Sequence, residues 1–169
     1  KELTNLPVYR RARLGVGYLP QEASVFRNLT VRQNLELVLQ ENPPPGEPQK
    51  NVVDRLIEDF GLQKIANIPG YSLSGGERRR VEIARSLAIL PDFLLLDEPF
   101  SGIDPIAVYD IQQIILRLRG KGFGILLTDH NVRDTLAITD RAYVIHQGKI
   151  MIEGSPEEVA ESEVARKFY

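Results

Sequence analysis

Two neighbouring carboxylates, Asp97 and Glu98, follow the apolar run Phe93–Leu96. A short run without polar alternation predicts a buried strand of a parallel sheet, and open α/β sheets place their ligand sites at the carboxyl ends of such strands. One carboxylate there could hold Mg²⁺, a hard cation that prefers oxygen, while the next polarises an attacking water. In phosphoryl transfer, the protein contributes mainly this kind of positioning and charge neutralisation. Alone, the pair is equally compatible with an ordinary acidic turn.

A turn with two glycines, Ser74-Gly75-Gly76-Glu77, lies upstream of that strand. Its first and last residues have the spacing of a capping box, which predicts a helix from here to about Leu90. The N-terminus of a helix offers free N–H groups and a positive dipole end that can bind phosphate oxygens, and the glycines would let the backbone come close. The alternative is a capping box with no ligand.

Gln21 and His130 each follow a predicted strand, Val16–Pro20 and Phe123–Thr128. The Gln21 amide could ligate Mg²⁺ and sense a phosphate, although out of context it is compatible with a surface glutamine. Because Phe123–Thr128 is the strand that follows the Asp97 strand, we expect His130 at the same edge of the sheet. There it could contact a γ-phosphate and hold the geometry that activates water. A lone histidine is otherwise more often structural.

The elements that must position these residues fall into three predicted parts: residues 1–21, a helical lobe over residues 22–73, and an α/β core over residues 74–169. In the lobe, Thr30 and Gln33 form a predicted capping box, and a second amphipathic helix ends at Gly61. In the core, Asp104 and Pro105 begin a helix. A hairpin around residues 147–148 and final helices from Ser155 complete the prediction.

Bulk composition excludes several classes of protein. A net charge of −2 argues against a duplex-DNA binder that works by bulk electrostatics, and no nucleic-acid partner is expected. The Arg78–Arg80 run is expected to form a solvated helix face or a sheet-packing edge. The absence of cysteine excludes disulfides and thiolate metal sites. No apolar run approaches the roughly 18 residues that a membrane helix needs.

The order of these motifs resembles that of ABC-type ATPases. Gln21 stands for the Q-loop, Ser74–Glu77 for the signature turn, Asp97 and Glu98 for the Walker B end, and His130 for the switch histidine. Ser101-Gly102-Ile103-Asp104 resembles the D-loop, with glycine in place of the usual alanine. The stretches 17–27, 77–85, 97–105 and 128–133 are more narrowly similar to the ATPases of lipopolysaccharide export.

The resemblance implies a P-loop NTPase fold of the α/β class, with a mostly parallel sheet, helices on both faces and a helical signature lobe. It implies ATP and Mg²⁺ as cofactors. Asp97 and Gln21 would support the metal, Glu98 would be the general base and His130 the switch. The signature turn and Asp104 would contact the nucleotide at the seam of a head-to-tail dimer.

Membrane partners are implied as well. The loop after Gln21 would form a groove for inner-membrane permease subunits, with Phe26 and Arg27 as an aromatic and cationic contact pair. Phe26 could instead pack the core of the lobe. The expected location is cytoplasmic, on the inner face of the inner membrane, where the protein would power lipopolysaccharide extraction and export.

No G-x-x-x-x-G-K-[ST] phosphate loop occurs in the 169 residues. Because the chain also begins at Lys1, we interpret it as a segment of a longer, N-terminally truncated protein. We expect the segment alone neither to bind ATP tightly nor to hydrolyse it, whereas the full-length protein should do both.

Three other functional interpretations of the sequence stay open. The ATPase of a branched-chain amino-acid importer has a similar layout. A DNA-repair or chromosome-maintenance ATPase head shares the signature turn, but it would need a long coiled coil between Gln21 and Ser74, where the Pro43–Gly46 break leaves no room for one. A degenerate ATPase kept only for binding is opposed by the presence of Asp97, Glu98 and His130.

Overall fold

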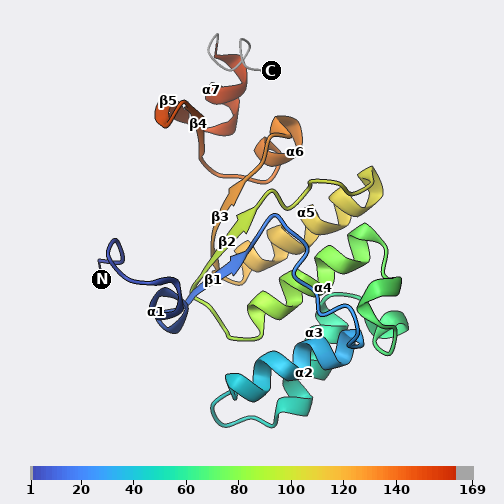
Figure 1. The fold of residues 1–169 in the computed structure, drawn as a ribbon. Helices are drawn as coiled ribbons and strands as arrows, with labels where there is room; N and C mark the ends of the chain where they lie inside the picture. Colours follow the sequence, from blue (N-terminus) through green and yellow to red (C-terminus); the bar gives the residue numbers. More distant parts are fainter. Residues whose placement is uncertain (1, 163–169) are drawn as a thin grey trace. The chain divides into compact units, whose positions relative to one another are not determined.

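The computed structural model describes residues 2–162, which divide into two compact units between Thr128 and Asp129. The first unit combines a parallel sheet with helices, and the second contains a β-hairpin and two short helices (Figure 1). Among residues 2–162, no helix has the length and apolar character needed to cross a membrane.

The sheet of the first unit has three parallel strands in the order β1-β2-β3, namely β1 (Val16–Leu19), β2 (Phe93–Asp97) and β3 (Gly124–Thr128). Their register pairs Leu19 with Leu96, and Asp97 with Thr128. The carboxyl ends of all three strands therefore lie at one edge of the sheet, as the sequence predicted.

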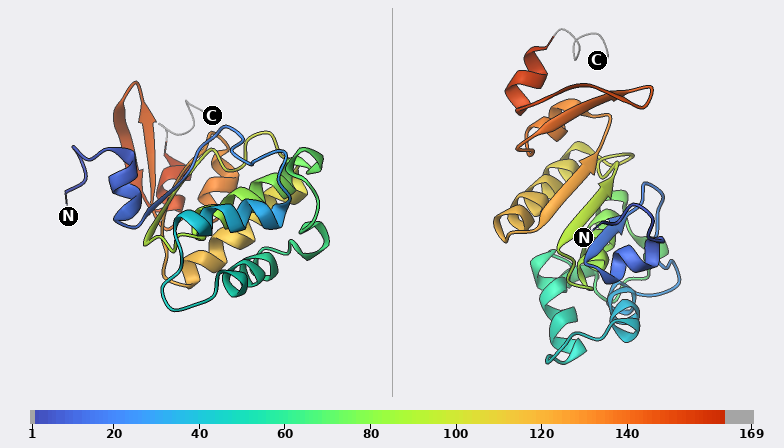
Figure 2. Two further views of the ribbon diagram at one scale, coloured as in Figure 1. Left: turned by 60° about the horizontal axis from the view of Figure 1, so that its bottom comes forward. Right: turned by 90° about the vertical axis from the view of Figure 1, so that its left-hand side faces the viewer.

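Helices α4 (Gly75–Leu87) and α5 (Pro105–Gly120) pack against the sheet, α4 on β1 and α5 on β3, and they also contact each other (Figure 2). Both begin as predicted, α4 with a Ser74–Glu77 capping box and α5 with Asp104 as N-cap. Helix α4 ends three residues before the predicted Leu90. Leu90 has a φ of 49°, which a continuing right-handed helix excludes.

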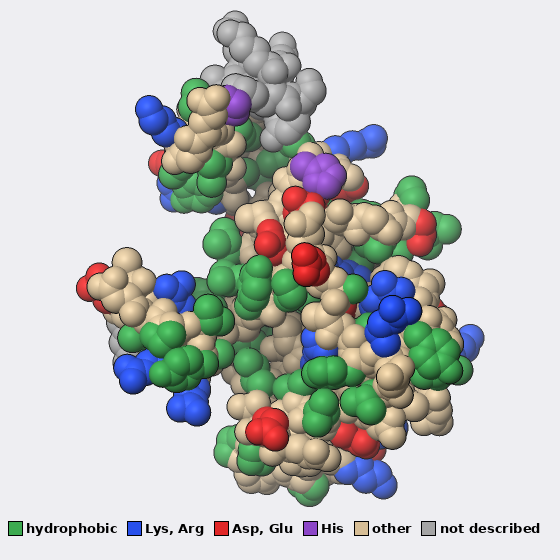
Figure 3. Space-filling view, viewed as in Figure 1, with side chains coloured by type: hydrophobic (Ala, Val, Ile, Leu, Met, Phe, Trp, Pro, Cys, Tyr) green, Lys and Arg blue, Asp and Glu red, His purple; other side chains and the backbone are tan. Residues whose placement is uncertain are grey.

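The two faces of the sheet differ in exposure. Leu94 and Leu96 are buried beneath the helices, whereas Phe93 and Leu126 on the other face are 58% and 59% exposed. Hydrophobic side chains accordingly gather over the strands in Figure 3. The prediction that Phe93–Asp97 is buried without alternation is therefore wrong, because burial alternates along β2: Leu94 and Leu96 are buried and Phe93 is exposed.

The helical lobe contains α2 (Val31–Glu41) and α3 (Gln49–Asp59), which pack on each other, and α2 also packs on α4. Helix α2 has the predicted capping box of Thr30 and Gln33. Two short 3₁₀ helices, η1 (Gln63–Ile65) and η2 (Gly70–Ser72), lead to the Ser74 turn. Apolar residues of α2 and α3 form the core of the lobe, among them Leu35, Leu39, Val53 and Ile57.

The second unit begins with α6 (Val132–Leu136), continues through the hairpin β4 (Ala142–His146) and β5 (Lys149–Gly154), and contains α7 (Pro156–Glu161). Gln147 and Gly148 connect the strands with φ values of 48° and 74°, as a two-residue hairpin turn requires. Ser155 caps α7 as predicted. Any helix after residue 162 lies outside the described residues.

Helix α1 (Val8–Arg13) was not predicted from the sequence. It lacks a side-chain cap, and none of its residues is buried, so the sequence gives no N-cap signal for its start. Arg11 stabilises its entry by donating hydrogen bonds to the carbonyl oxygens of Leu6 (2.8 Å) and Thr4 (3.0 Å).

Candidate functional site

Asp97 is held at the end of β2 by hydroxyl groups from both neighbouring strands. Thr128 on β3 donates to Oδ1 at 2.7 Å, and Tyr18 on β1 donates to Oδ2 at 3.2 Å. Desolvation, and then the hydrogen bond to Asp97, raise the pKa of Tyr18. The carboxylate is thus oriented by its partners, which is the usual state of a metal-ligating carboxylate.

Glu98 occupies a turn of unusual backbone geometry immediately after β2. Its φ is 43°, a left-handed value that a residue with a side chain rarely adopts and that is found preferentially at functional sites. Its N–H donates to the Thr128 carbonyl at 2.8 Å. Gln21 donates from Nε2 to the Glu98 carboxylate at 2.7 Å. The structure therefore brings together Gln21 and Glu98, which lie far apart in the sequence.

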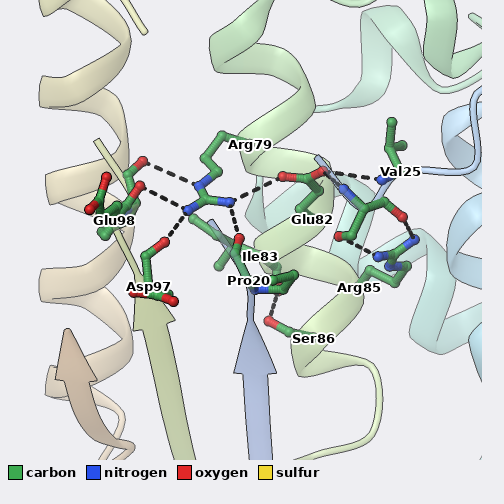
Figure 4. A network of polar contacts seen from close by, with 11 residues as sticks. Pro20, Val25, Arg79, Glu82, Ile83, Arg85, Ser86, Asp97 and Glu98 are labelled. Atoms are coloured by element: carbon green, nitrogen blue, oxygen red, sulfur yellow. Dashed lines mark hydrogen bonds and ion pairs between the residues drawn. The ribbon is translucent and has the colours of Figure 1, made fainter. Parts of the chain in front are cut away.

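Arg79 on α4 holds this turn from beneath. Its side chain is buried, and it donates to the carbonyls of Asp97 (2.7 Å), Glu98 (3.0 Å) and Pro99 (3.3 Å), to the Pro20 carbonyl (2.9 Å) and to Glu82 (3.3 Å) (Figure 4). These bonds use all five donor positions of a guanidinium. Of the two roles expected for the arginine run, Arg79 therefore takes a packing role at the end of the sheet.

The signature turn is a complete capping box. Ser74 Oγ accepts the Glu77 N–H at 3.3 Å, and the Glu77 carboxylate accepts from the Ser74 N–H at 2.9 Å and from the Ser74 hydroxyl at 2.8 Å. These hydrogen bonds, first from the Ser74 backbone and then from its side chain, lower the pKa of Glu77 below its ordinary value. The turn is preorganised at the N-terminus of α4, where amide groups can receive an anion.

Acid should remove the part of the stability that the Glu77 charge contributes. Because the folded-state pKa is lowered, this contribution is present above the ordinary pKa near 4.5 and is lost as the pH falls through the lowered value. We expect Glu77→Gln to reduce the free energy of unfolding by about 0.3–1 kcal/mol at pH 7. Urea unfolding of both proteins at pH 7 and pH 3 measures this difference, and a difference that grows in acid would contradict the assignment.

The two glycines of the Ser74 turn lie close to α5 and to the residues just before it. A Cβ at Gly75 would lie 3.3 Å from Ile103 Cγ2, and a Cβ at Gly76 would overlap Ala107 Cβ. Gly76 is buried, whereas Gly75 is exposed. Close packing of α4 on α5 is therefore a reason for glycine at position 76 that the sequence analysis did not anticipate.

Gly76→Ala is expected to lower the free energy of unfolding by about 1–3 kcal/mol, since the added methyl group overpacks the α4–α5 contact. Chemical denaturation measures the effect. The double variant Gly76→Ala/Ala107→Gly removes the overlapping methyl group and should recover most of the loss. If the double variant is less stable than Gly76→Ala, the packing explanation is wrong.

Asp104 and His130 have less specific surroundings. The Asp104 carboxylate accepts the N–H groups of Ile106 (3.1 Å) and Ala107 (3.0 Å), so it caps α5. His130 belongs to the second unit; its side chain is mostly exposed, and Nδ1 lies 3.8 Å from Oδ1 of the buried Asp129 side chain. The expected roles of both residues toward nucleotide remain predictions.

Phe26 and Arg27 lie on an exposed loop. The Phe26 ring is 45% exposed and has the Arg85 guanidinium 5.0 Å from its centroid, so the alternative that Phe26 packs the lobe core is wrong. A depression of about 320 Å³ beside it is lined by Ala23, Val25, Arg27 and Arg78. Burial of Arg85 lowers its pKa.

Asn34 fixes the conformation of this loop from inside the lobe. It is fully buried; its Oδ1 accepts the Phe26 N–H at 2.8 Å, and its Nδ2 donates to the carbonyls of Phe26, Leu29 and Thr30. The surface at Phe26 and Arg27 is thus presented on a backbone held by buried polar contacts.

The donor set fits Mg²⁺ bound together with a nucleotide. Among the described residues, no group of three or more His, Cys, Asp and Glu side chains could hold a metal alone. Mg²⁺ commonly takes only one or two protein carboxylates and obtains its remaining ligands from phosphates and water. Asp97, already oriented by two hydroxyl groups, suits that arrangement. The hydrogen bond from Gln21 to Glu98 is made by Nε2 and does not involve the amide oxygen of Gln21.

Several residues of this site were not predicted from the sequence. They are the hydroxyl partners of Asp97, the buried ion pair on α4 and the buried amide that holds the Phe26 loop: Tyr18, Thr128, Arg79, Glu82 and Asn34. The spacing of Arg79, Glu82 and Arg85 along one helix face, beside apolar residues, was the available signal. The partners themselves depend on strand register and helix packing, which local sequence does not reveal.

Known proteins match both the sequence and the structure. The ABC transporter family profile matches residues 1–101. A probable ABC transporter ATP-binding protein of Azorhizobium caulinodans is 53% identical over 99% of the chain and 60% of its own length. The lipopolysaccharide export system ATP-binding protein LptB of Escherichia coli is 50% identical over 99% of the chain and 70% of its own length.

A solved ATP-binding cassette of an ABC transporter, in its ADP conformation, superposes with a TM-score of 0.86 at 26% identity, covering all of the chain and 73% of its own. The protein cbiO1 of Clostridium perfringens, part of the ABC transporter complex cbiONQ, gives a TM-score of 0.82 at 28% identity, over 94% of the chain and 64% of its own. The chain spans about 60–70% of the length of the curated relatives named above. By sequence and by fold, this chain belongs to the ABC transporter family of ATP-binding proteins.

Proposed function

We propose that the whole protein is the ATP-hydrolysing subunit of an ABC transporter. The observation that carries the proposal is the convergence of Gln21, Asp97 and Glu98 at the carboxyl edge of the sheet, with Gln21 bonded to Glu98 at 2.7 Å. When Mg²⁺ is bound together with ATP, it neutralises phosphate charge. Asp97 and Gln21 would hold it, and Glu98 would accept the proton of the attacking water as general base.

A second copy of the protein would complete the nucleotide site. The Ser74–Glu77 turn presents the N-terminus of α4, and in a head-to-tail dimer it would cover the nucleotide bound to the other copy. Asp104 and His130 would complete the seam as D-loop and switch residues. The three-part division at residues 21 and 73 is part of the same proposal, with the helical lobe carrying the signature turn.

We infer that lipopolysaccharide is the cargo of the complete transporter. The support is the LptB relative of Escherichia coli, which is named for lipopolysaccharide export. Inner-membrane permease subunits would dock beside Phe26 and Arg27, and the protein would then lie on the cytoplasmic face of that membrane. The branched-chain amino-acid importer is the alternative. A coiled-coil ATPase head is disfavoured, since the described residues between Gln21 and Ser74 form helices of at most 11 residues.

Reconstitution distinguishes the two transport functions. The whole protein and the permease subunits that copurify with it are placed in proteoliposomes, and ATP turnover is measured with lipopolysaccharide or with leucine, isoleucine and valine. Stimulation by lipopolysaccharide and not by amino acids supports the proposal. Stimulation only by amino acids would establish the importer. Absence of ATP turnover would leave only the degenerate ATPase that is kept for binding.

A further inference from the structure

We propose that Glu82 is a positioning residue that joins the loop after β1 to the Glu98 turn through Arg79. Its buried carboxylate contacts both the backbone N–H groups of that loop and the guanidinium beneath the turn (Figure 4). The functional importance of the Glu98 turn rests on the proposed function, whereas the connection itself rests on the contacts alone.

The first half of the connection is the loop between β1 and α2. Glu82 Oε1 accepts the N–H groups of Ser24 at 2.6 Å and Val25 at 3.1 Å, and Glu82 is 3% exposed. Hydrogen bonds from two successive amides to one charged, buried oxygen are stronger than bonds between neutral groups. Glu82 thereby fixes the loop that begins with Gln21 to α4 at Ser24 and Val25.

The second half is the ion pair between Glu82 and Arg79. Glu82 Oε2 lies 3.3 Å from Arg79 Nη1, and the two side chains are only 2% and 7% exposed. Arg79 in turn donates to the carbonyls of Asp97, Glu98 and Pro99. Two segments that leave different strands of the sheet are thus linked through one pair of side chains on α4.

This arrangement does more than fill space. A buried ion pair is not in general more stabilising than well-packed apolar residues, so its presence favours a role in fixing one conformation. The conformation to be fixed is the left-handed backbone of Glu98, which persists only where surrounding contacts determine it. Without the charge of Glu82, Arg79 keeps its carbonyl partners, Pro20 included, but loses the ion pair that connects it to the Ser24 and Val25 amides.

Arg85 provides an internal comparison. It donates to the Ser24 carbonyl and hydroxyl, both at 2.6 Å, and its guanidinium lies over the Phe26 ring. Arg85 therefore holds the same loop as Glu82, but its hydrogen bonds run to Ser24 and not to the Glu98 turn. A variant at Arg85 should disturb the loop while leaving the backbone of the turn unchanged.

The test measures amide hydrogen exchange by NMR in the whole protein, together with kcat and KM for ATP. Ser24 and Val25 report on the loop, while Glu98 and Ser101, whose N–H groups bond to Thr128 and Glu98 carbonyls, report on the turn. We expect Glu82→Gln to accelerate exchange at least about tenfold at both places and to lower kcat about tenfold while KM changes less than twofold.

Three further variants make the result specific. Arg85→Gln should accelerate exchange at Ser24 and Val25 only, and the exposed carboxylate variant Glu58→Gln should change neither region. The Arg79→Lys variant has three side-chain donors instead of five. If Glu82 acts through Arg79, adding Glu82→Gln to this variant should accelerate exchange at Glu98 and Ser101 little further. Glu82→Asp keeps the charge but cannot reach both partners, and it carries the test if Glu82→Gln fails to fold.

Faster exchange in the loop with unchanged exchange at Glu98 and Ser101 would overturn the proposal, as would full additivity with Arg79→Lys. The exchange measurements do not require catalysis. If the whole protein does not hydrolyse ATP, the proposed function fails while the exchange data still decide whether Glu82 joins the two segments.

Discussion

Glu98→Gln is expected to reduce ATP turnover by the whole protein at least about 100-fold, because an amide cannot accept the proton of the attacking water. The substitution keeps the size of the side chain and an oxygen that can accept from Gln21 Nε2, so the turn should keep its structure. ATP binding should therefore persist. Single-turnover hydrolysis and equilibrium nucleotide binding, measured on the same preparation, separate these two effects.

The control is Glu58→Gln, which removes an exposed carboxylate from α3 and should leave turnover unchanged. Retention of more than about a tenth of the wild-type turnover by Glu98→Gln would exclude Glu98 as the general base. Loss of ATP binding together with turnover would instead indicate a role in binding the nucleotide.

Arg79→Ala is expected to lower the free energy of unfolding by about 3–5 kcal/mol, the range for breaking a buried ion pair from one side. The substitution leaves the Glu82 carboxylate buried without its partner and removes hydrogen bonds from the carbonyls of Pro20, Asp97, Glu98 and Pro99. Urea unfolding followed by circular dichroism measures the loss.

Arg80→Ala is the matched control for that prediction, because Arg80 is the next residue of the same helix but is not buried. Its effect should stay within about 0.5 kcal/mol, as for other surface substitutions. Equal losses from the two variants would show that general helix stability, and not the buried network, accounts for the effect of Arg79→Ala.

Helix starts were the most predictable part of the fold. Ser74, Thr30 and Ser155 each cap a helix with the acidic or amide residue three positions on, as their spacing predicted. A capping box is a local interaction, so the sequence contains all of it. Helix α1 lacks such a cap, and it was correspondingly missed.

Exposure across the sheet was less predictable. The apolar run Phe93–Leu96 indicated a strand covered on both faces, but Phe93 is exposed, since coverage depends on which elements pack nearby. The hydrogen bond between Gln21 and Glu98 and the contacts of Tyr18 and Arg79 were not predicted from the sequence. They depend on strand register and on how α4 lies against the sheet, which are tertiary properties.

Mg²⁺-dependent ATP hydrolysis by the whole protein, on a sample of known intact mass, tests the central claim most directly. The account predicts a mass above 19.1 kDa, the value for these 169 residues, and turnover that disappears when Mg²⁺ is chelated. The 169-residue chain alone should show neither turnover nor micromolar affinity for ATP. Absence of Mg²⁺-dependent turnover in a sample whose mass includes a phosphate loop would contradict the assignment of Asp97 and Glu98 to an ATPase site.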